Sequence, residues 1–298
     1  MFKGSITALI TPFKNGEIDW PAFENLVEWQ IEQGSHGLVP CGTTGESPTV
    51  SHDEHKAIVQ KCVEVTNKRV PVIAGTGSNS TAEAIELTQS AKEAGADAAL
   101  SVVPYYNKPT QEGMIAHFTA ILDAVSIPTV LYNIPGRCVV DMANETIAAL
   151  SKHPDIVGVK DATGAVERVP ALKALVAGGF CQLSGNDDSI AGFMAQGGDG
   201  VISVVANIAP ALNAQMIEAW EASDHKTFEA IRDRLAPLSR DLFCEANPAP
   251  VKYAAQVLGI CGDEVRLPLL PASASARALV DAGLSHAQLS ANQKASAA

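Results

Sequence analysis

Eight short runs of apolar and β-branched residues, each followed by a stretch with helical spacing, constrain the fold of this chain most strongly. In the helical stretches apolar residues recur at offsets of three, four, seven and eight, which places them on one buried face. Strands that alternate with helices are typical of a parallel sheet covered by its crossover helices. The predicted strands are Ser5–Thr11, Gly37–Cys41, Val70–Gly75, Ala98–Val103, Pro128–Asn133, Ile156–Lys160, Phe180–Ser184 and Val201–Val205.

The number of strand–helix units predicts a closed barrel. Eight such units within residues 1–223 match the count and length of a (β/α)8 barrel. A doubly wound sheet is the structural alternative, because periodicity does not report closure. That fold usually has fewer strands and a glycine-rich phosphate motif, and the nearest match, Gly75–Ser80, lacks the third glycine. We therefore predict a barrel over residues 1–223. A helical extension over 224–298, with a break near Pro237, is expected to pack on it.

Composition and charge exclude several classes of protein. The chain has 33 acidic and 21 basic residues, a formal charge of −12 and no run of lysine and arginine, so a nucleic-acid partner is not expected. No apolar stretch reaches membrane-spanning length, and the N-terminal residues enter a predicted strand without a signal segment. The six cysteines lack CxxC spacing, which indicates neither a zinc site nor a disulfide framework. We expect a cytoplasmic enzyme that binds small molecules and no metal.

Lys160 ends the predicted strand Ile156–Lys160. Stripping an ammonium of water costs several kcal/mol, so a lysine at the end of a buried strand needs a reason. A partly desolvated lysine has a lowered pKa and can condense with a ketone as the free amine. The structural alternative is that Lys160 extends to solvent or pairs with Asp161.

Polar motifs also follow three other predicted strands. The carboxyl ends of barrel strands meet at one face, where the active sites of this fold lie. Each motif alone is compatible with a plain turn, rim packing or a surface charge, but their joint placement on one face favours an active site. The four motifs are Cys41–Ser47, Pro104–Asn107, Tyr132–Arg137 and Lys160–Gly164.

The strings GTTGES, YNIPGR and GVKDATG resemble those of the dihydrodipicolinate synthase family. This family belongs to the pyruvate-dependent class I aldolases, a superfamily that includes N-acetylneuraminate lyase. The resemblance extends from Gly4 through the helical C-terminus. GTTGE and the lysine mark the superfamily, whereas Arg137 is the narrower signal, since sugar-acid lyases usually carry a smaller residue there. Asp161 departs mildly from the glutamate of many members.

The resemblance implies a Schiff-base mechanism that needs no other cofactor. Lys160 would form the imine with pyruvate, and Tyr132 would act as the general acid and base. Thr43 would link Tyr132 to Tyr106, which in the family reaches in from the adjacent subunit. The backbone N–H groups of Thr43 and Thr44 would bind the pyruvate carboxylate.

The resemblance also implies the second substrate and the assembly. Arg137 would bind the carboxylate of L-aspartate-4-semialdehyde, and Gly185 and Ile202 would line the pocket. The expected product is 4-hydroxy-tetrahydrodipicolinate, at the committed step of diaminopimelate and lysine biosynthesis. The enzyme would be a carbon–oxygen lyase, and the assembly a homotetramer built as a dimer of dimers.

A further implication is feedback inhibition by L-lysine. The positions that match the family's lysine site are all polar, and the Glu83 carboxylate suits an ammonium. The structural alternative is that Glu83 serves only as the capping partner of Ser80. Pro48 stands where alanine is common. We expect partial inhibition that is not competitive with pyruvate, at Ser47, His52, His55, Asn79, Glu83 and Tyr105.

Three other functions are alternatives to this interpretation. A metal-dependent aldolase needs clustered ligands at strand ends, but the seven histidines fall mostly on predicted helices or helix ends. A non-enzymatic binding module would not need Lys160, Tyr132 and Tyr106 together. A lyase or aldolase for 2-keto-3-deoxy sugar acids or N-acetylneuraminate shares the Schiff base, and Arg137 favours the semialdehyde over it.

Overall fold

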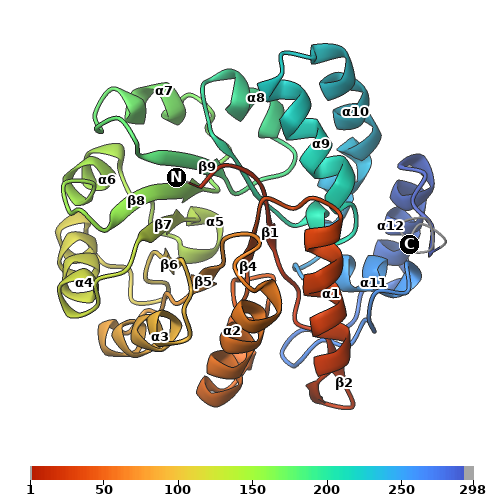
Figure 1. Ribbon diagram of the computed structural model, residues 1–298, viewed down its shortest axis with the longest axis horizontal. Coiled ribbons are helices and arrows are strands. Elements are labelled where there is room, and N and C mark those ends of the chain that lie inside the picture. The colour runs from red at the N-terminus through yellow and green to blue at the C-terminus, as the bar shows by residue number, and fades with distance from the viewer. Residues whose placement is uncertain (1, 292–298) are drawn as a thin grey trace.

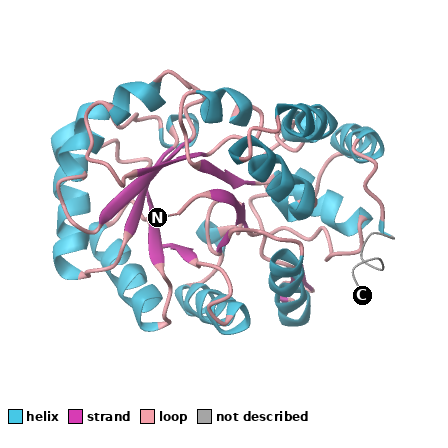
Figure 2. Ribbon diagram, turned by 45° about the horizontal axis from the view of Figure 1, so that its top comes forward, coloured by secondary structure: helices cyan, strands magenta, loops and turns pink. Residues whose placement is uncertain are grey.

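Eight parallel strands form a barrel in the computed structural model, which describes residues 2–291 (Figures 1 and 2). The sheet closes between its two end strands through a parallel bridge of Leu38 with Val72, and Leu38 N donates to Pro71 O at 3.0 Å. The predicted barrel is confirmed, and each predicted strand overlaps an observed one. In sheet order the strands are β4 (Gly37–Val39), β1 (Gly4–Ala8), β10 (Gly200–Ser203), β9 (Cys181–Ser184), β8 (Ile156–Asp161), β7 (Thr129–Asn133), β6 (Ala98–Val102) and β5 (Ile73–Gly75).

Helices surround the barrel (Figure 2). Ser51 caps the helix that follows β4 with the reciprocal bonds of a capping box: Ser51 N donates to Glu54 at 2.7 Å, and Glu54 N donates to Ser51 Oγ at 3.2 Å. The helices of the barrel are α1 (Trp20–Glu32), α2 (His52–Thr66), α3 (Thr81–Glu93), α4 (Gln111–Ala124), α5 (Pro135–Cys138), α6 (Asn144–Leu150), α7 (Arg168–Lys173), α8 (Ile190–Ala195) and α9 (Pro210–Glu221), with 3-10 turns η1 (Ser47–Thr49) and η2 (Val205–Asn207).

A small hairpin precedes α1 and was not predicted. Strands β2 (Phe13–Lys14) and β3 (Glu17–Ile18) pair antiparallel around Asn15 and Gly16, whose φ angles are +55° and +83°. Asn-Gly suits a two-residue turn with both φ angles positive. Strands of two residues are too short to show an alternating pattern. The Glu264 carboxylate accepts both turn N–H groups, at 2.8 and 2.6 Å, and ties the hairpin to the C-terminal segment.

Three helices follow the barrel: α10 (His225–Asp241), α11 (Ala249–Val257) and α12 (Ala274–His286). Their apolar side chains belong to the same buried cluster as residues of the barrel helices, for example Val251 and Val280 with Phe23. Figure 1 shows these helices packed beside α1 and α9 at one side of the barrel. The last residues of the predicted extension, 292–298, lie outside the described residues.

The predicted helix break near Pro237 is wrong, because α10 runs through that residue. Proline removes one helical N–H donor and leaves the carbonyl four residues earlier without its partner. That carbonyl belongs to Asp233, and it accepts a hydrogen bond from His286 Nε2 of α12 at 3.2 Å. A tertiary contact thus compensates the lost bond, which the local sequence does not reveal.

Candidate active site

Lys160 lies inside the mouth of the barrel, on β8. It is 6% exposed, and its Nζ is 4.3 Å from the centre of the Tyr132 ring. Burial lowers the pKa of Lys160 to about 8, although the Asp187 carboxylate raises it, and Arg137 lowers it further. At pH 7 roughly a tenth of the Lys160 side chains are therefore the free amine, which is the form that attacks a carbonyl.

Asp161 does not pair with Lys160. Successive side chains of a strand point to opposite faces, so Asp161 points away from Lys160. Its Oδ1 accepts from the backbone N and the hydroxyl of Thr163, at 2.8 and 2.5 Å, and its Oδ2 accepts from Arg168 Nε at 3.1 Å. The structural alternative of a Lys160–Asp161 pair is therefore wrong.

Tyr132 lies opposite Lys160 on the neighbouring strand β7, in register with it. Burial raises the pKa of Tyr132 to about 12, while a hydrogen bond with the Thr43 side chain and the charge of Arg137 oppose this rise. The phenol is thus protonated at neutral pH and in contact with Thr43. A proton that leaves Tyr132 must be replaced, and the Thr43 hydroxyl can donate and accept one.

The loop after β4 presents free backbone donors. Cys41 and Glu46 have φ angles of +55° and +57°, and Glu46 N donates to Thr43 O at 3.1 Å. Within residues 2–291 no acceptor takes the backbone N–H groups of Thr43 and Thr44. Consecutive free N–H groups in a tight turn form a small anion site. The predicted pair of donors is therefore available to a carboxylate.

Three residues of the C-terminal segment hold this loop, and sequence reasoning missed them. Lys252 Nζ lies 2.5 Å from Glu46 Oε1, with both side chains buried, and Arg266 N donates to Glu46 Oε2 at 3.0 Å. Asn247 Nδ2 donates to Thr44 Oγ1 at 2.9 Å. These contacts join residues about 200 positions apart, a separation that no local pattern reports.

Arg137 lies in α5, directly after β7, and is exposed. Its Nη2 donates to the carbonyl of Asn247 at 3.3 Å. Its charge acts on both Lys160 and Tyr132, so it belongs to the same mouth. The remaining guanidinium N–H groups form a planar fork that suits a carboxylate.

Gly185 and Ile202 lie at the ends of two further barrel strands. Gly185 N donates to Asp161 O at 2.6 Å, and a Cβ at this glycine would lie 2.6 Å from the Ala162 Cβ. Only glycine allows this close approach. Ile202 is fully buried and belongs to the apolar cluster that also contains Tyr132.

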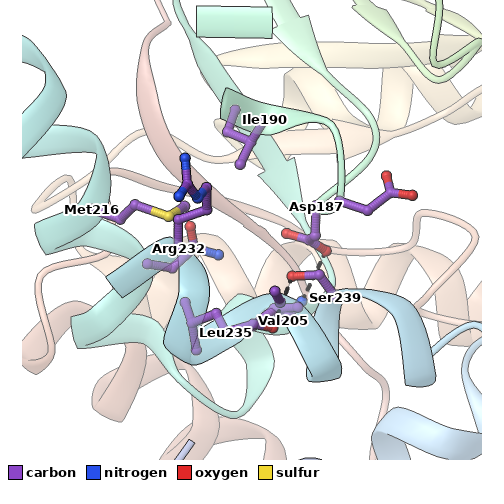
Figure 3. A pocket seen from close by; sticks show the side chains of 10 residues that line it. Asp187, Ile190, Val205, Met216, Arg232, Leu235 and Ser239 are labelled. Carbon is purple, nitrogen blue, oxygen red and sulfur yellow. Dashed lines mark hydrogen bonds between the residues drawn. The ribbon is translucent and has the colours of Figure 1, made fainter. Parts of the chain in front are cut away.

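Asp187 is a charged residue near Lys160 that sequence reasoning missed. It follows β9, is 8% exposed, and its charge acts on the ammonium of Lys160. It also borders a cavity of about 100 Å³, across which Arg232 and Met216 lie in Figure 3. The only available signal was a carboxylate shortly after a strand end, in the run Gly185-Asn186-Asp187-Asp188.

Tyr106 is not part of this cluster within one chain. It is 89% exposed and has a φ angle of +74°. Among the described residues no hydrogen bond joins it to Thr43 or Tyr132. An exposed tyrosine on a constrained backbone is compatible with a role at an interface between subunits.

A second cleft, of about 190 Å³, gathers five of the six residues predicted for lysine binding. The sixth, Asn79, contacts the set through its amide, which donates to Tyr105 O at 3.1 Å. His52 Nε2 lies 2.8 Å from Glu83 Oε1, and burial lowers the pKa of His55. The five residues that line the cleft are Ser47, His52, His55, Glu83 and Tyr105.

Of the two reciprocal capping bonds expected between Ser80 and Glu83, only the one from the Glu83 backbone forms. Ser80 Oγ accepts from Glu83 N at 3.4 Å, as a capping residue does. The Glu83 carboxylate does not return this bond; it accepts from the Ser78 hydroxyl and contacts His52. Ser80 N donates instead to Ser78 Oγ at 3.0 Å. The carboxylate therefore belongs to the cleft.

A (β/α)8 barrel with a buried lysine, held partly as free amine at its mouth, is an arrangement in which an enzyme can use lysine as a nucleophile. The model of the dihydrodipicolinate synthetase family matches residues 1–287. The chain belongs to this family.

Proteins similar to this chain match it over nearly its whole length. The 4-hydroxy-tetrahydrodipicolinate synthase of Parvibaculum lavamentivorans is 61% identical over 276 residues, which cover 93% of this chain and 95% of that one. The chloride-inhibited dihydrodipicolinate synthase of Acinetobacter baumannii, complexed with pyruvate, is 47% identical with a TM-score of 0.94, covering 97% and 100%. The DHDPS of Cyanidioschyzon merolae with lysine bound is 38% identical with a TM-score of 0.93, covering 97% and 99%.

Across positions 2–291 no helix has the length and apolar character needed to cross a membrane. In the same range no three His, Cys, Asp or Glu side chains gather in a way that could hold a metal ion.

Proposed function

We propose that this enzyme condenses pyruvate with L-aspartate-4-semialdehyde to give 4-hydroxy-tetrahydrodipicolinate, as a lyase of the carbon–oxygen class in the cytoplasm. The observation that carries the proposal is Lys160, buried opposite Tyr132 with its pKa lowered to about 8. Family membership and the pyruvate complex of the Acinetobacter baumannii relative support pyruvate as the first substrate.

The chemistry follows from a free amine beside a protonated phenol. Lys160 Nζ attacks C2 of pyruvate, and the carbinolamine loses water to give a protonated imine. The imine withdraws electrons, so the methyl group loses a proton and becomes the enamine carbon that attacks the aldehyde of the second substrate. Tyr132 supplies and recovers the protons of imine formation, and Thr43 relays them.

Two carboxylates are recognised in the proposed complex. The pyruvate carboxylate binds the free backbone N–H groups of Thr43 and Thr44, in the loop held by Glu46 and Lys252. Arg137 binds the carboxylate of the semialdehyde through its planar fork, and Gly185 and Ile202 line the space between. This set of contacts needs no cofactor beyond the covalent imine.

We further propose that the active unit contains more than one chain and that L-lysine inhibits it. Exposure of Tyr106 supports its entry into a neighbour's relay, in a homotetramer built as a dimer of dimers. The cleft around Glu83 supports lysine binding, and a relative is known with lysine bound. Tyr105 lines this cleft beside Tyr106, so an occupied cleft disturbs the relay and inhibits partially.

The proposed reaction is tested by steady-state rates with the two substrates. Purified protein should form product from pyruvate and L-aspartate-4-semialdehyde, and Lys160→Arg, which keeps a cation but is not a nucleophile, should abolish it. N-acetylneuraminate serves as the competing substrate. Efficient cleavage of N-acetylneuraminate, with no product from the semialdehyde, would contradict the proposal.

A further inference from the structure

The Asp187 carboxylate is fixed by three hydrogen-bond donors. Its Oδ1 accepts from Ser203 Oγ at 2.5 Å, and its Oδ2 accepts from the backbone N–H groups of Val204 and Val205 at 2.9 and 3.1 Å. A carboxyl group that accepts at both oxygens has no proton of its own in these bonds. The bonding pattern is therefore that of a carboxylate anion.

The hydrogen of Ser203 confirms this direction. Ser203 Oγ accepts from Asn213 Nδ2 at 2.6 Å and from the backbone N of Ala206 at 2.9 Å. Both partners are donors, so the single hydroxyl hydrogen points to Asp187. Ser203, Asn213 and Asp187 are all at least nine-tenths buried. A buried network with every donor aimed at one carboxylate holds a negative charge in place.

This negative charge faces Lys160 without binding it. Asp187 follows β9, the strand next to Lys160, and the loop crosses the end of β8 through the bond of Gly185 N to Asp161 O. Each of the two charges lowers the free-energy cost of burying the other. Within the described part of the chain no ion pair of 4.0 Å or less joins them, so the Lys160 nitrogen remains free to react.

The other titratable groups around this pair come from β7, α5, the loop after β9 and α10. Tyr132 of β7 contacts Lys160 through its ring, and Arg137 of α5 opposes the positive charge of the ammonium. Asp187 also borders the cavity shown in Figure 3, together with Asp188 of the same loop and Arg232 of α10. Burial raises the pKa of Asp187, while Ser203, the two backbone N–H groups and Lys160 lower it.

We propose that Asp187 is a positioning residue that supplies the counter-charge for the cations formed at Lys160. The inference rests on the proposed function. Two states of the nitrogen are cationic: the resting ammonium and the protonated imine that appears when the carbinolamine loses water. The enamine that follows proton loss from the methyl group is neutral. A fixed anion nearby stabilises both cations and leaves the neutral enamine unaffected.

The test is the pH dependence of kcat/KM for pyruvate in Asp187→Asn. Its acid limb reports the loss of the free amine in the free enzyme. Because a nearby negative charge raises the pKa of an ammonium, removal of the Asp187 charge should move this limb to lower pH by about one unit. The protonated imine should also become about tenfold scarcer at a given pH, so kcat should fall although more free amine is present.

Two variants separate charge from structure. Asp188→Asn removes the neighbouring exposed carboxylate and should leave the limb and kcat unchanged. Ser203→Ala loosens the network but keeps the charge, so its acid limb should stay at the wild-type pH. If Asp187→Asn is insoluble, Asp187→Ala can replace it, because the shortened side chain borders an existing cavity. The same shift of the acid limb is expected.

A separate experiment tests the proposed function, so failure of the counter-charge can be distinguished from failure of that function. Trapping of pyruvate on wild-type Lys160 with borohydride tests that function by itself. A shift of the acid limb to lower pH in Asp187→Asn, with no shift in Asp188→Asn, supports the role of Asp187 as the counter-charge. An unmoved limb in a folded Asp187→Asn protein, even with reduced kcat, would overturn it and leave Asp187 a structural residue.

Discussion

Two buried lysines of this chain meet opposite surroundings, and the contrast explains which one reacts. Lys252 is fully buried, lies 2.5 Å from Glu46 and donates to the Glu264 carbonyl at 2.7 Å. Burial lowers the pKa of Lys252 too, but the adjacent Glu46 carboxylate opposes this change, and two of the three N–H donors are engaged. Lys160 is nearly as buried, but its nearest charged partner acts from a distance, and its pKa falls to about 8. Burial without a contact partner makes the amine available.

At the residue scale, Arg137→Ala should weaken binding of the semialdehyde much more than binding of pyruvate. Loss of a charge-assisted carboxylate contact costs about 1.5–3 kcal/mol, which is roughly one to two decades in affinity. KM for each substrate is the measurement, with Arg240→Ala on the exposed end of α10 as the control. Equal losses for both substrates would assign Arg137 a structural role.

The residues of the site differ in how far the sequence could predict them. Lys160 and Tyr132 lie near the carboxyl ends of their strands, and Thr43 and Arg137 follow strands, so the barrel alone brings these residues to one mouth. Asp187 also follows a strand, but its charge could be recognised only through donors from β10 and η2. The sequence carries no sign of which donors will surround a carboxylate.

At the element scale, the loop after β4 depends on the segment that follows α11. Arg266 donates to both oxygens of Glu54, at 2.8 and 2.6 Å, and its backbone N binds Glu46. Its guanidinium also lies 4.3 Å from the ring of Phe13. One arginine therefore joins the start of α2, the hairpin and the loop after β4. These contacts depend on residues far apart in the chain, which is why periodicity predicted the helices but not their connections.

We predict that Glu54→Gln destabilises the fold by about 1 kcal/mol at neutral pH, because the pair with Arg266 is partly exposed. The Arg266 hydrogen bond lowers the pKa of Glu54 from 4.5 to about 2. A lowered carboxyl pKa stabilises the folded state above pH 4.5, and this contribution is lost as the pH falls toward 2.

The measurement is the free energy of unfolding by urea at pH 7 and near pH 3. The difference between wild type and Glu54→Gln should shrink at the lower pH. Glu64→Gln, which removes a more exposed partner of Lys61, is the control and should change little. A difference that stays constant with pH would show that the ion pair is not its source.

At the scale of the whole molecule, the segment that follows the barrel holds the loop after β4. We propose that residues 1–223 form the catalytic barrel and that the following residues, described as far as 291, are an extension within the same folding unit. They share one apolar cluster with the barrel helices and supply Asn247 and Lys252 to its loop. The sequence predicted these helices, whereas their contacts with the loop depend on tertiary packing.

Shared active sites predict complementation between inactive variants. Tyr106→Phe and Lys160→Ala should each be inactive, and a mixture of the two proteins should recover part of the activity. In the proposed assembly, where Tyr106 enters the site of a neighbouring chain, hybrid assemblies contain sites with neither change. Light scattering and subunit exchange with a labelled chain are the controls. No recovery despite proven exchange would place Tyr106 outside the relay.

Feedback control predicts a partial loss of rate when L-lysine is added, with no competition against pyruvate. Glu83→Ala should abolish the inhibition and retain catalysis, because the carboxylate that receives the ammonium is gone while the active site is intact. Lys56–Glu86 lies on the same helices outside the cleft, so Glu86→Ala is the matched control. Unchanged wild-type rates at high lysine would refute regulation at this cleft.

The covalent step at Lys160 is the central claim, and trapping it is the most direct measurement. Protein treated with pyruvate and borohydride should lose activity and gain one reduced pyruvyl group per chain. Peptide mass spectrometry should find this group on Lys160 and not on Lys252, the other buried lysine of residues 2–291. A label on another residue, or full activity after treatment with no label, would contradict the Schiff-base mechanism.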